Sequence, residues 1–88
     1  MSQRFVHQNQ GTCSSSVEFI IDEGRIRSVS FRGGCNGNLQ GISRLVEGLE
    51  IGEAVKRLSG IRCGDNPTSC PDQLARALVE AGSPDRRD

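Results

Sequence analysis

Residues 17–31 of this 88-residue chain read VEFIIDEGRIRSVSF. Apolar side chains take alternate positions on both sides of the central DEG, at Val17, Phe19 and Ile21 before it and at Val29 and Phe31 after it. Alternation with a period of two is typical of a strand with one buried face, and a short polar sequence with glycine between two such runs is typical of a hairpin turn. The segment predicts a β-hairpin whose odd-numbered side chains face the core.

The requirement that both apolar sets face the core also restricts the register of the hairpin. Paired residues must then have numbers that add to an even value, because a slip of one residue would turn one strand over. A loop of residues 23–25 meets this condition, pairs Phe19 with Val29 and, extended to the open end of the hairpin, pairs Cys13 with Cys35. The other even register, with paired numbers that add to 46, shifts the two thiols by only one step along the same face. Opposed Cβ atoms lie about 4.5–5.5 Å apart, a separation at which two thiolates can bind one metal ion.

Three segments after the hairpin have helical features. In the first segment the apolar residues recur every three or four positions, at Leu39, Ile42, Leu45, Val46 and Leu49, and so form one face of a helix. Capping and terminating residues set the expected limits. The predicted helices run from a cap at Asn36 or Asn38 to Gly48, over residues 53–58, and over residues 71–81 with Ser69 as the N-cap.

A hairpin followed by helices predicts an α+β fold, in which three helices pack on one face of a small antiparallel sheet. We expect a single domain over residues 11–82. Residues 1–10 would form an N-terminal arm or an edge strand, and residues 83–88 a flexible tail.

The composition narrows the function before any motif is considered. Eleven basic and eleven acidic residues cancel, so binding to nucleic acid is not expected. The longest apolar runs, such as residues 19–21, are far too short to cross a membrane, and the N-terminal residues lack the apolar stretch of a signal peptide. These features predict a cytoplasmic protein without membrane association, in a compartment where structural disulfides are rare.

The four cysteines are the strongest candidates for a functional site. Only 34% of the residues are hydrophobic, and a domain this small often needs a cross-link. Cys13 and Cys35 would meet at the hairpin end, Cys70 would begin the last helix, and Cys63 lies seven residues earlier across a loop. In a reducing compartment this arrangement favours a shared metal site over disulfides.

The residues alone leave three questions about these cysteines open. Four separate cysteines that serve as small apolar side chains are the alternative to a shared site. Both zinc and iron accept four thiolates, so the metal is not determined. The lone histidine, His7, lies in a polar segment, and we interpret it as a solvated side chain rather than a ligand.

Three blocks of sequence resemble the signature of the TSCPD domain family. They are GCNGNL at residues 34–39, GIRCG at residues 60–64 and TSCPD itself at residues 68–72, in the order found in the family. The likeness extends over about residues 11–81. Members occur as a C-terminal module of adenosylcobalamin-dependent ribonucleotide reductases and as small stand-alone proteins, and the family is regarded as zinc-binding.

The resemblance implies a function for the cysteines. Cys13, Cys35, Cys63 and Cys70 would bind zinc, and the module would have a structural or partner-docking role beside a ribonucleotide reductase. The chain has no room for a reductase barrel or a cobalamin site. Catalysis by the chain alone is therefore not implied, and any enzymatic role would be as part of a ribonucleoside-diphosphate reductase.

Two alternative functions remain open at this point. In the first, the module is a thiol/disulfide relay for the reductase, with Cys63 and Cys70 as the cycling pair. The second follows from a weaker similarity, because the order of elements resembles the iron–sulfur cluster scaffold proteins. Three cysteines of that family correspond to Cys13, Cys35 and Cys70, so this similarity implies an iron–sulfur cluster in place of zinc.

Overall fold

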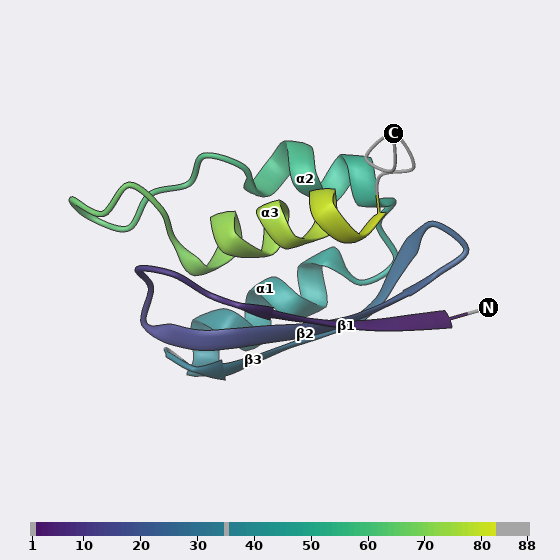
Figure 1. The fold of residues 1–88 in the computed structure, drawn as a ribbon, viewed down its shortest axis with the longest axis horizontal. Coiled ribbons are helices and arrows are strands. Elements are labelled where there is room, and N and C mark those ends of the chain that lie inside the picture. The colour runs from purple at the N-terminus through teal and green to yellow at the C-terminus, as the bar shows by residue number, and fades with distance from the viewer. Residues whose placement is uncertain (1, 35, 83–88) are drawn as a thin grey trace.

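The chain forms a sheet of three antiparallel strands followed by three helices, as Figure 1 shows for a computed structural model that describes residues 2–34 and 36–82. In chain order the elements are β1 (Ser2–Gln8), β2 (Ser14–Asp22), β3 (Arg25–Gly33), α1 (Asn36–Val46), α2 (Ile51–Leu58) and α3 (Cys70–Gly82). This architecture confirms the predicted α+β class. The N-terminal segment forms an edge strand, β1, and the predicted tail of residues 83–88 lies outside the described residues.

The centre of the hairpin has the register that the alternating apolar residues predict. Val17 pairs with Phe31 and Phe19 pairs with Val29, between β2 and β3. On the other side of β2, Phe5 of β1 pairs with Phe19, and the two rings stack with their centroids 5.4 Å apart. Strand β2 is therefore the central strand, and its odd-numbered side chains from Val17 onward face the core.

The turn of the hairpin is shorter than predicted. Asp22 pairs with Arg25, so only Glu23 and Gly24 connect the strands. Both connecting residues have positive φ, 55° and 79°, which is the backbone of the two-residue turns that match the twist of a hairpin. The predicted loop of residues 23–25 is one residue too long.

A β-bulge next to this turn changes which side chains of β3 face the core. Ile21 opposes Ile26 whereas Ile20 opposes Ser28, so Arg27 is an extra residue without a partner position on β2. The extra residue reverses the alternation, and Ile26 becomes a core side chain with 1% of its surface exposed. The expectation that only odd-numbered residues of the hairpin face the core is therefore wrong at this end.

A second irregularity occurs at the open end of the hairpin. Ser16 pairs with Arg32, but Ser14 pairs with Gly33, so the register has moved by one residue before Cys13 is reached. The shift turns the Ser14 side chain into the interior, where 1% of its surface is exposed. The extrapolation that paired Cys13 with Cys35 does not survive this shift, and Cys35 itself lies outside the described residues.

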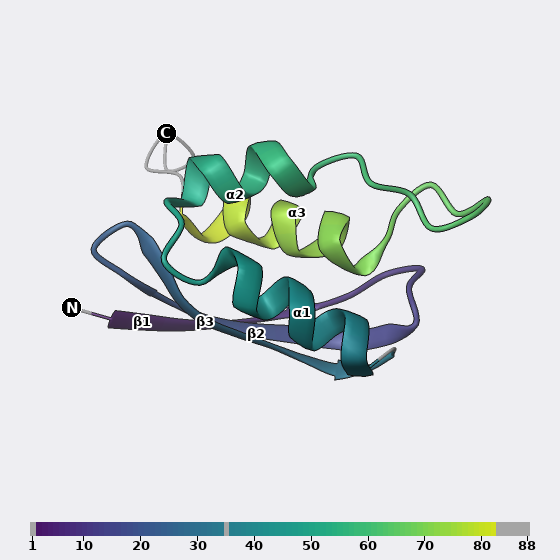
Figure 2. The same ribbon diagram turned by 180° about the vertical axis from the view of Figure 1, so that it is seen from behind.

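All three helices lie on the same side of the sheet (Figures 1 and 2). Helix α1 packs against β3, α3 packs against β1 and β2, and α2 packs against α3. Because α3 lies between the sheet and α2, it is buried over most of its circumference and supplies a third of the core cluster. That cluster comprises Val17, Phe19, Ile21, Ile26, Val29, Val46, Ala54, Leu58, Leu74, Ala75, Ala77 and Leu78.

Helix α1 confirms the first predicted helix but not the whole of its predicted apolar face. Leu39 and Val46 are buried, whereas Leu45 is 77% exposed. At about 100° per residue, Leu45 is displaced by roughly 110° from the direction in which Leu39 and Val46 point, so it faces away from β3. Gly48, with φ of 88°, ends the helix as predicted, and Leu49 packs on the core from beyond that end.

Helices α2 and α3 agree with the predicted segments to within two residues at each end. None of the helices in residues 2–34 and 36–82 is both long enough and apolar enough to cross a membrane.

Candidate functional site

The TSCPD sequence forms the beginning of α3, and Ser69 is its N-cap as predicted. The Ser69 hydroxyl oxygen accepts the backbone N–H of Asp72 at 3.2 Å, which satisfies one of the donors that a helix leaves unpaired at its start. The same hydroxyl donates to the carbonyl of Ile61 at 2.7 Å. Ser69 therefore caps α3. It also holds Ile61, near the α2 end of the loop between α2 and α3, next to the start of α3.

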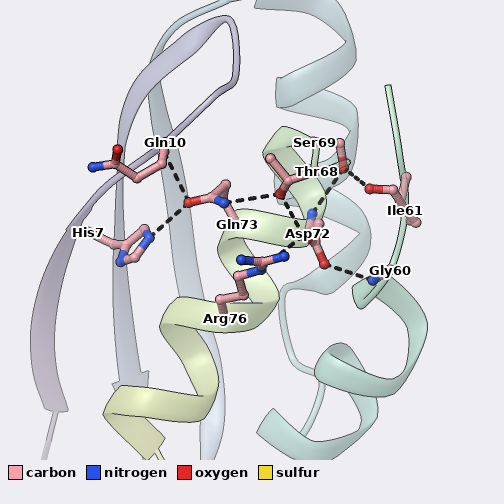
Figure 3. Close-up of polar contacts among 9 residues, drawn as sticks. All are labelled: His7, Gln10, Gly60, Ile61, Thr68, Ser69, Asp72, Gln73 and Arg76. Atoms are coloured by element: carbon pink, nitrogen blue, oxygen red, sulfur yellow. Dashed lines mark hydrogen bonds and ion pairs between the residues drawn. The ribbon is translucent and has the colours of Figure 1, made fainter. Parts of the chain in front are cut away.

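The carboxylate of Asp72 is the centre of a buried polar network (Figure 3). It accepts the backbone N–H of Gly60 at 2.7 Å, the Thr68 hydroxyl at 2.5 Å and Nε of Arg76 at 3.0 Å. Burial by itself would raise the pKa of this carboxyl, but the bonds from Thr68 and Gly60 and the charge of Arg76 outweigh burial and hold the pKa below its ordinary value. Asp72 is thus an ionised group in the interior whose two carboxylate oxygens both accept hydrogen bonds.

Gln73, the residue after the motif, connects α3 to the N-terminal strand. Its Nε2 donates to the Thr68 hydroxyl at 3.0 Å, and its Oε1 accepts the backbone N–H of Gln10 at 3.1 Å. His7 lies with Nε2 3.2 Å from the same Oε1 and is half-buried, so the interpretation of His7 as a solvated side chain is wrong. Sequence analysis missed Gln73 because nothing in its surroundings marks a buried glutamine.

Cys70 is the first residue of α3, and its thiol lies beside residues of the β1–β2 connection and of β2. Its Sγ is 3.8 Å from Sγ of Cys13 and 2.8 Å from the hydroxyl oxygen of Ser14, and only 6% of the residue is exposed. Burial raises the pKa of the thiol, but hydrogen bonds from Ser14, Cys13 and Thr12 lower it to a value below the ordinary one. A sulfur in this setting is suited to the thiolate form.

The distance between the Cys13 and Cys70 sulfurs can be compared with the separation of two sulfur ligands on one zinc ion. A tetrahedral zinc ion with Zn–S bonds of about 2.3 Å holds its sulfur ligands about 3.8 Å apart. Cys13 and Cys70 already have this separation, 3.8 Å. Gly34 borders the pair closely, because a Cβ atom added to it would lie 3.1 Å from Sγ of Cys13. The donor atoms present therefore fit two corners of a thiolate tetrahedron.

Cys63 lies on the exposed tip of the loop between α2 and α3. Its carbonyl accepts the backbone N–H of Asn66 at 3.0 Å, which makes a tight turn with Gly64 at φ of 59°. Cys63 lines a cleft of about 310 Å³ together with Cys13 and Cys70. The other apolar side chains of this cleft are Leu39, Ile42, Ile61 and Pro71.

The structure therefore brings two of the four predicted ligands into contact and places a third beside the same cleft. Among residues 2–34 and 36–82, no three His, Cys, Asp or Glu side chains are close enough together to hold a metal ion. The fourth predicted ligand, Cys35, lies outside the described residues. Gly34 borders Cys13, and Leu39 of the same sequence block lines the cleft.

The three sequence blocks converge in space, since residues from each of them line the cysteine cleft. This arrangement defines a small α+β domain with a thiol pair at the start of its buried helix. The chain belongs to the TSCPD domain family, because the family model matches residues 2–82 and so includes β1 as well as the motif. No curated protein and no solved structure gives a significant match to the chain.

Proposed function

We propose that this protein is a small metal-binding module in which Cys13, Cys35, Cys63 and Cys70 supply four thiolates to a zinc ion. The observation that carries the proposal is the 3.8 Å separation of the Cys13 and Cys70 sulfurs, which equals the edge of a zinc thiolate tetrahedron. Loop 61–68 would bring in Cys63, since Gly60 and Ile61 at its start are hydrogen-bonded to Asp72 and Ser69 and Cys63 borders the same cleft.

A closed four-thiolate centre has a structural role. It has no open position for water or substrate, so it stabilises a fold rather than activating a reactant. Here the metal would join the start of β2, the start of α3 and the loop between α2 and α3, which are held in this region by few core side chains. Membership of the TSCPD family supports association with a ribonucleotide reductase, and a site of reduced thiolates suits the cytoplasm.

Metal analysis of anaerobically purified protein tests this proposal. We expect one zinc per chain and no visible absorption, and removal of the metal with a chelator should lower the unfolding midpoint by at least about 10 °C, because structural zinc contributes roughly 10 kcal/mol or more of apparent binding energy. Visible absorption with bound iron would instead support an iron–sulfur cluster.

Variants of the individual ligands refine the same test. Cys70→Ser and Cys35→Ser should each lose most of the zinc and destabilise the fold. The exposed serine of β2, Ser15, offers a matched control, and Ser15→Ala should keep one zinc per chain. Cysteine variants that keep their zinc and melt within about 2 °C of the wild type would contradict the metal centre.

The same contact favours a second function, a thiol/disulfide relay for the reductase. The lowered pKa of Cys70 and its 3.8 Å distance from Cys13 make these two residues the relay pair, in place of the predicted Cys63 and Cys70. The two thiols would form one disulfide, and their two electrons and two protons would reduce a disulfide of the partner to two thiols. A metal-free protein that forms the Cys13–Cys70 disulfide reversibly in glutathione buffers would favour this function over the zinc centre.

A further inference from the structure

Cys70 is the last member of a hydrogen-bonded chain of three side chains from three different parts of the fold. Asn9, in the connection between β1 and β2, donates from Nδ2 to the hydroxyl oxygen of Ser14 at 2.8 Å. The Ser14 hydroxyl in turn lies 2.8 Å from Sγ of Cys70. Ser14 is 1% exposed, so both contacts are made in the interior, away from water.

The first contact leaves the proton of the Ser14 hydroxyl free for the second. The Asn9 amide nitrogen can only donate a hydrogen bond, so the Ser14 oxygen accepts there. The single proton of that hydroxyl is then available for the Cys70 sulfur. A thiolate sulfur carries no proton, so in the thiolate form of Cys70 the Ser14 hydroxyl is the donor and the sulfur is the acceptor.

The position of Ser14 is maintained by backbone contacts that do not involve its hydroxyl. The backbone N–H of Asn9 donates to the carbonyl of Ser15 at 2.9 Å, and the Thr12 hydroxyl donates to the carbonyl of Ser14 at 2.9 Å. These bonds remain when the Ser14 side chain is shortened. The connection between β1 and β2 can therefore keep its shape when a substitution removes the Ser14 hydroxyl, the donor to the Cys70 sulfur.

We propose that Asn9 and Ser14 are positioning residues that act through Cys70, holding its sulfur as an oriented, negatively polarised metal ligand. The proposal rests on the metal-binding function proposed above and adds the outer-shell groups that tune one of its ligands. Hydrogen bonds of this kind fix the orientation of a ligand, and their removal typically lowers metal affinity by about 10- to 100-fold.

Two variants test the chain, and a third serves as the control. Ser14→Ala removes the donor to sulfur. Asn9→Asp is nearly isosteric but presents an acceptor to Ser14, so it draws the hydroxyl proton away from Cys70 and adds a negative charge next to an anionic centre. Ser15→Ala removes an exposed hydroxyl of the same strand that bonds to the carbonyl of Arg32 and not to sulfur. Circular dichroism of each variant establishes that it is folded.

The first measurement is zinc affinity, by competition with a chromophoric chelator. Ser14→Ala and Asn9→Asp should each bind zinc about 10-fold more weakly than the wild type, and Ser15→Ala should bind with unchanged affinity. The second measurement is the alkylation rate of Cys70 in metal-free protein at neutral pH, followed by mass spectrometry. Without the donor the rate should differ from that of the wild type by about threefold, because the Ser14 hydroxyl no longer orients the sulfur, whereas Ser15→Ala should keep the wild-type rate.

The two measurements separate this proposal from the proposed function. If the wild type binds no metal, the metal-binding function fails, and the alkylation rates of metal-free protein decide the role of Asn9 and Ser14 by themselves. The proposal is overturned if Ser14→Ala or Asn9→Asp has the zinc affinity and the alkylation rate of the wild type, or the wild-type alkylation rate alone where the wild type binds no metal. It is also overturned if Ser15→Ala changes these quantities as much as the other two variants do. If Ser14→Ala does not fold, the comparison of Asn9→Asp with Ser15→Ala decides.

Discussion

The carboxylate of Asp72 accepts the backbone N–H of Gly60 at 2.7 Å and so joins the first turn of α3 to the end of α2. Ser69 makes a parallel connection to the carbonyl of Ile61. Together these bonds close the base of the loop whose tip carries Cys63. The loop therefore begins and ends beside Cys70, although Cys63 itself is exposed.

Replacement of Asp72 should destabilise the protein through this network. Asp72→Asn keeps the size of the side chain but loses its charge and presents an N–H₂ group where Thr68 and Arg76 donate. Bonds to a buried charged group contribute about 1.5–3 kcal/mol each, so we expect a loss of about 2 kcal/mol and a midpoint about 10 °C lower. Thermal unfolding measures the midpoint. Glu53→Gln, which breaks the ion pair with Arg57 at the surface, is the control and should leave the midpoint unchanged. An Asp72→Asn midpoint equal to that of wild type would mean that the network does not stabilise the fold.

The same carboxyl should make stability depend on pH in the acid range. Its pKa is lower in the folded protein than in the unfolded chain, so its contribution is complete above the unfolded value of about 4 and is lost as the pH falls through the folded value. Urea unfolding of wild type between pH 7 and pH 2.5 should show this decline. The free energy of unfolding should decline less steeply with falling pH in Asp72→Asn than in the wild type. If it declines equally in the two proteins, Asp72 is not the group that causes the decline.

Gly34 should be required for the position of Cys13. It has φ of 81°, and a Cβ atom there would lie 2.9 Å from Cδ1 of Leu39 and 3.1 Å from Sγ of Cys13. Gly24 is a matched control, because its φ is 79° and a Cβ atom there would meet nothing within 4 Å. Both alanine variants should lose about 1 kcal/mol or more of stability through backbone strain. Only Gly34→Ala should also weaken zinc binding, and equal zinc affinity in the two variants would count against this role.

Cys63 is the ligand that separates the proposed functions. In a four-thiolate centre Cys63→Ala should lose zinc about as severely as Cys13→Ala, because each variant removes one of four equivalent ligands. In an iron–sulfur scaffold with three ligands, Cys63→Ala would still bind its cluster. Zinc content after anaerobic gel filtration makes the comparison, and full retention of zinc by Cys63→Ala would contradict the four-thiolate assignment.

Features of the site that depend on neighbouring residues in the chain could be predicted from the sequence. Ser69 was expected to cap α3, and it does, because a cap acts on a backbone N–H only three residues away. The partners of Cys70 could not be predicted in this way. Asn9 and Ser14 reach it from more than fifty residues away in the chain, and the register shift at Ser15 that turns Ser14 inward has no local signature.

The amino-acid sequence by itself determined the hairpin, the three helices and the family of this protein. Period-two alternation from Val17 to Phe31 and helical spacing after it are local patterns, and each specifies which face of one element is buried. Only the tertiary structure decided that Ile26 enters the core, that Asp72 joins α2 to α3, and that Cys13 lies against Cys70. These outcomes depend on two bulges and on the packing of α3 between the sheet and α2, which arise from the fit of whole elements rather than from any one segment.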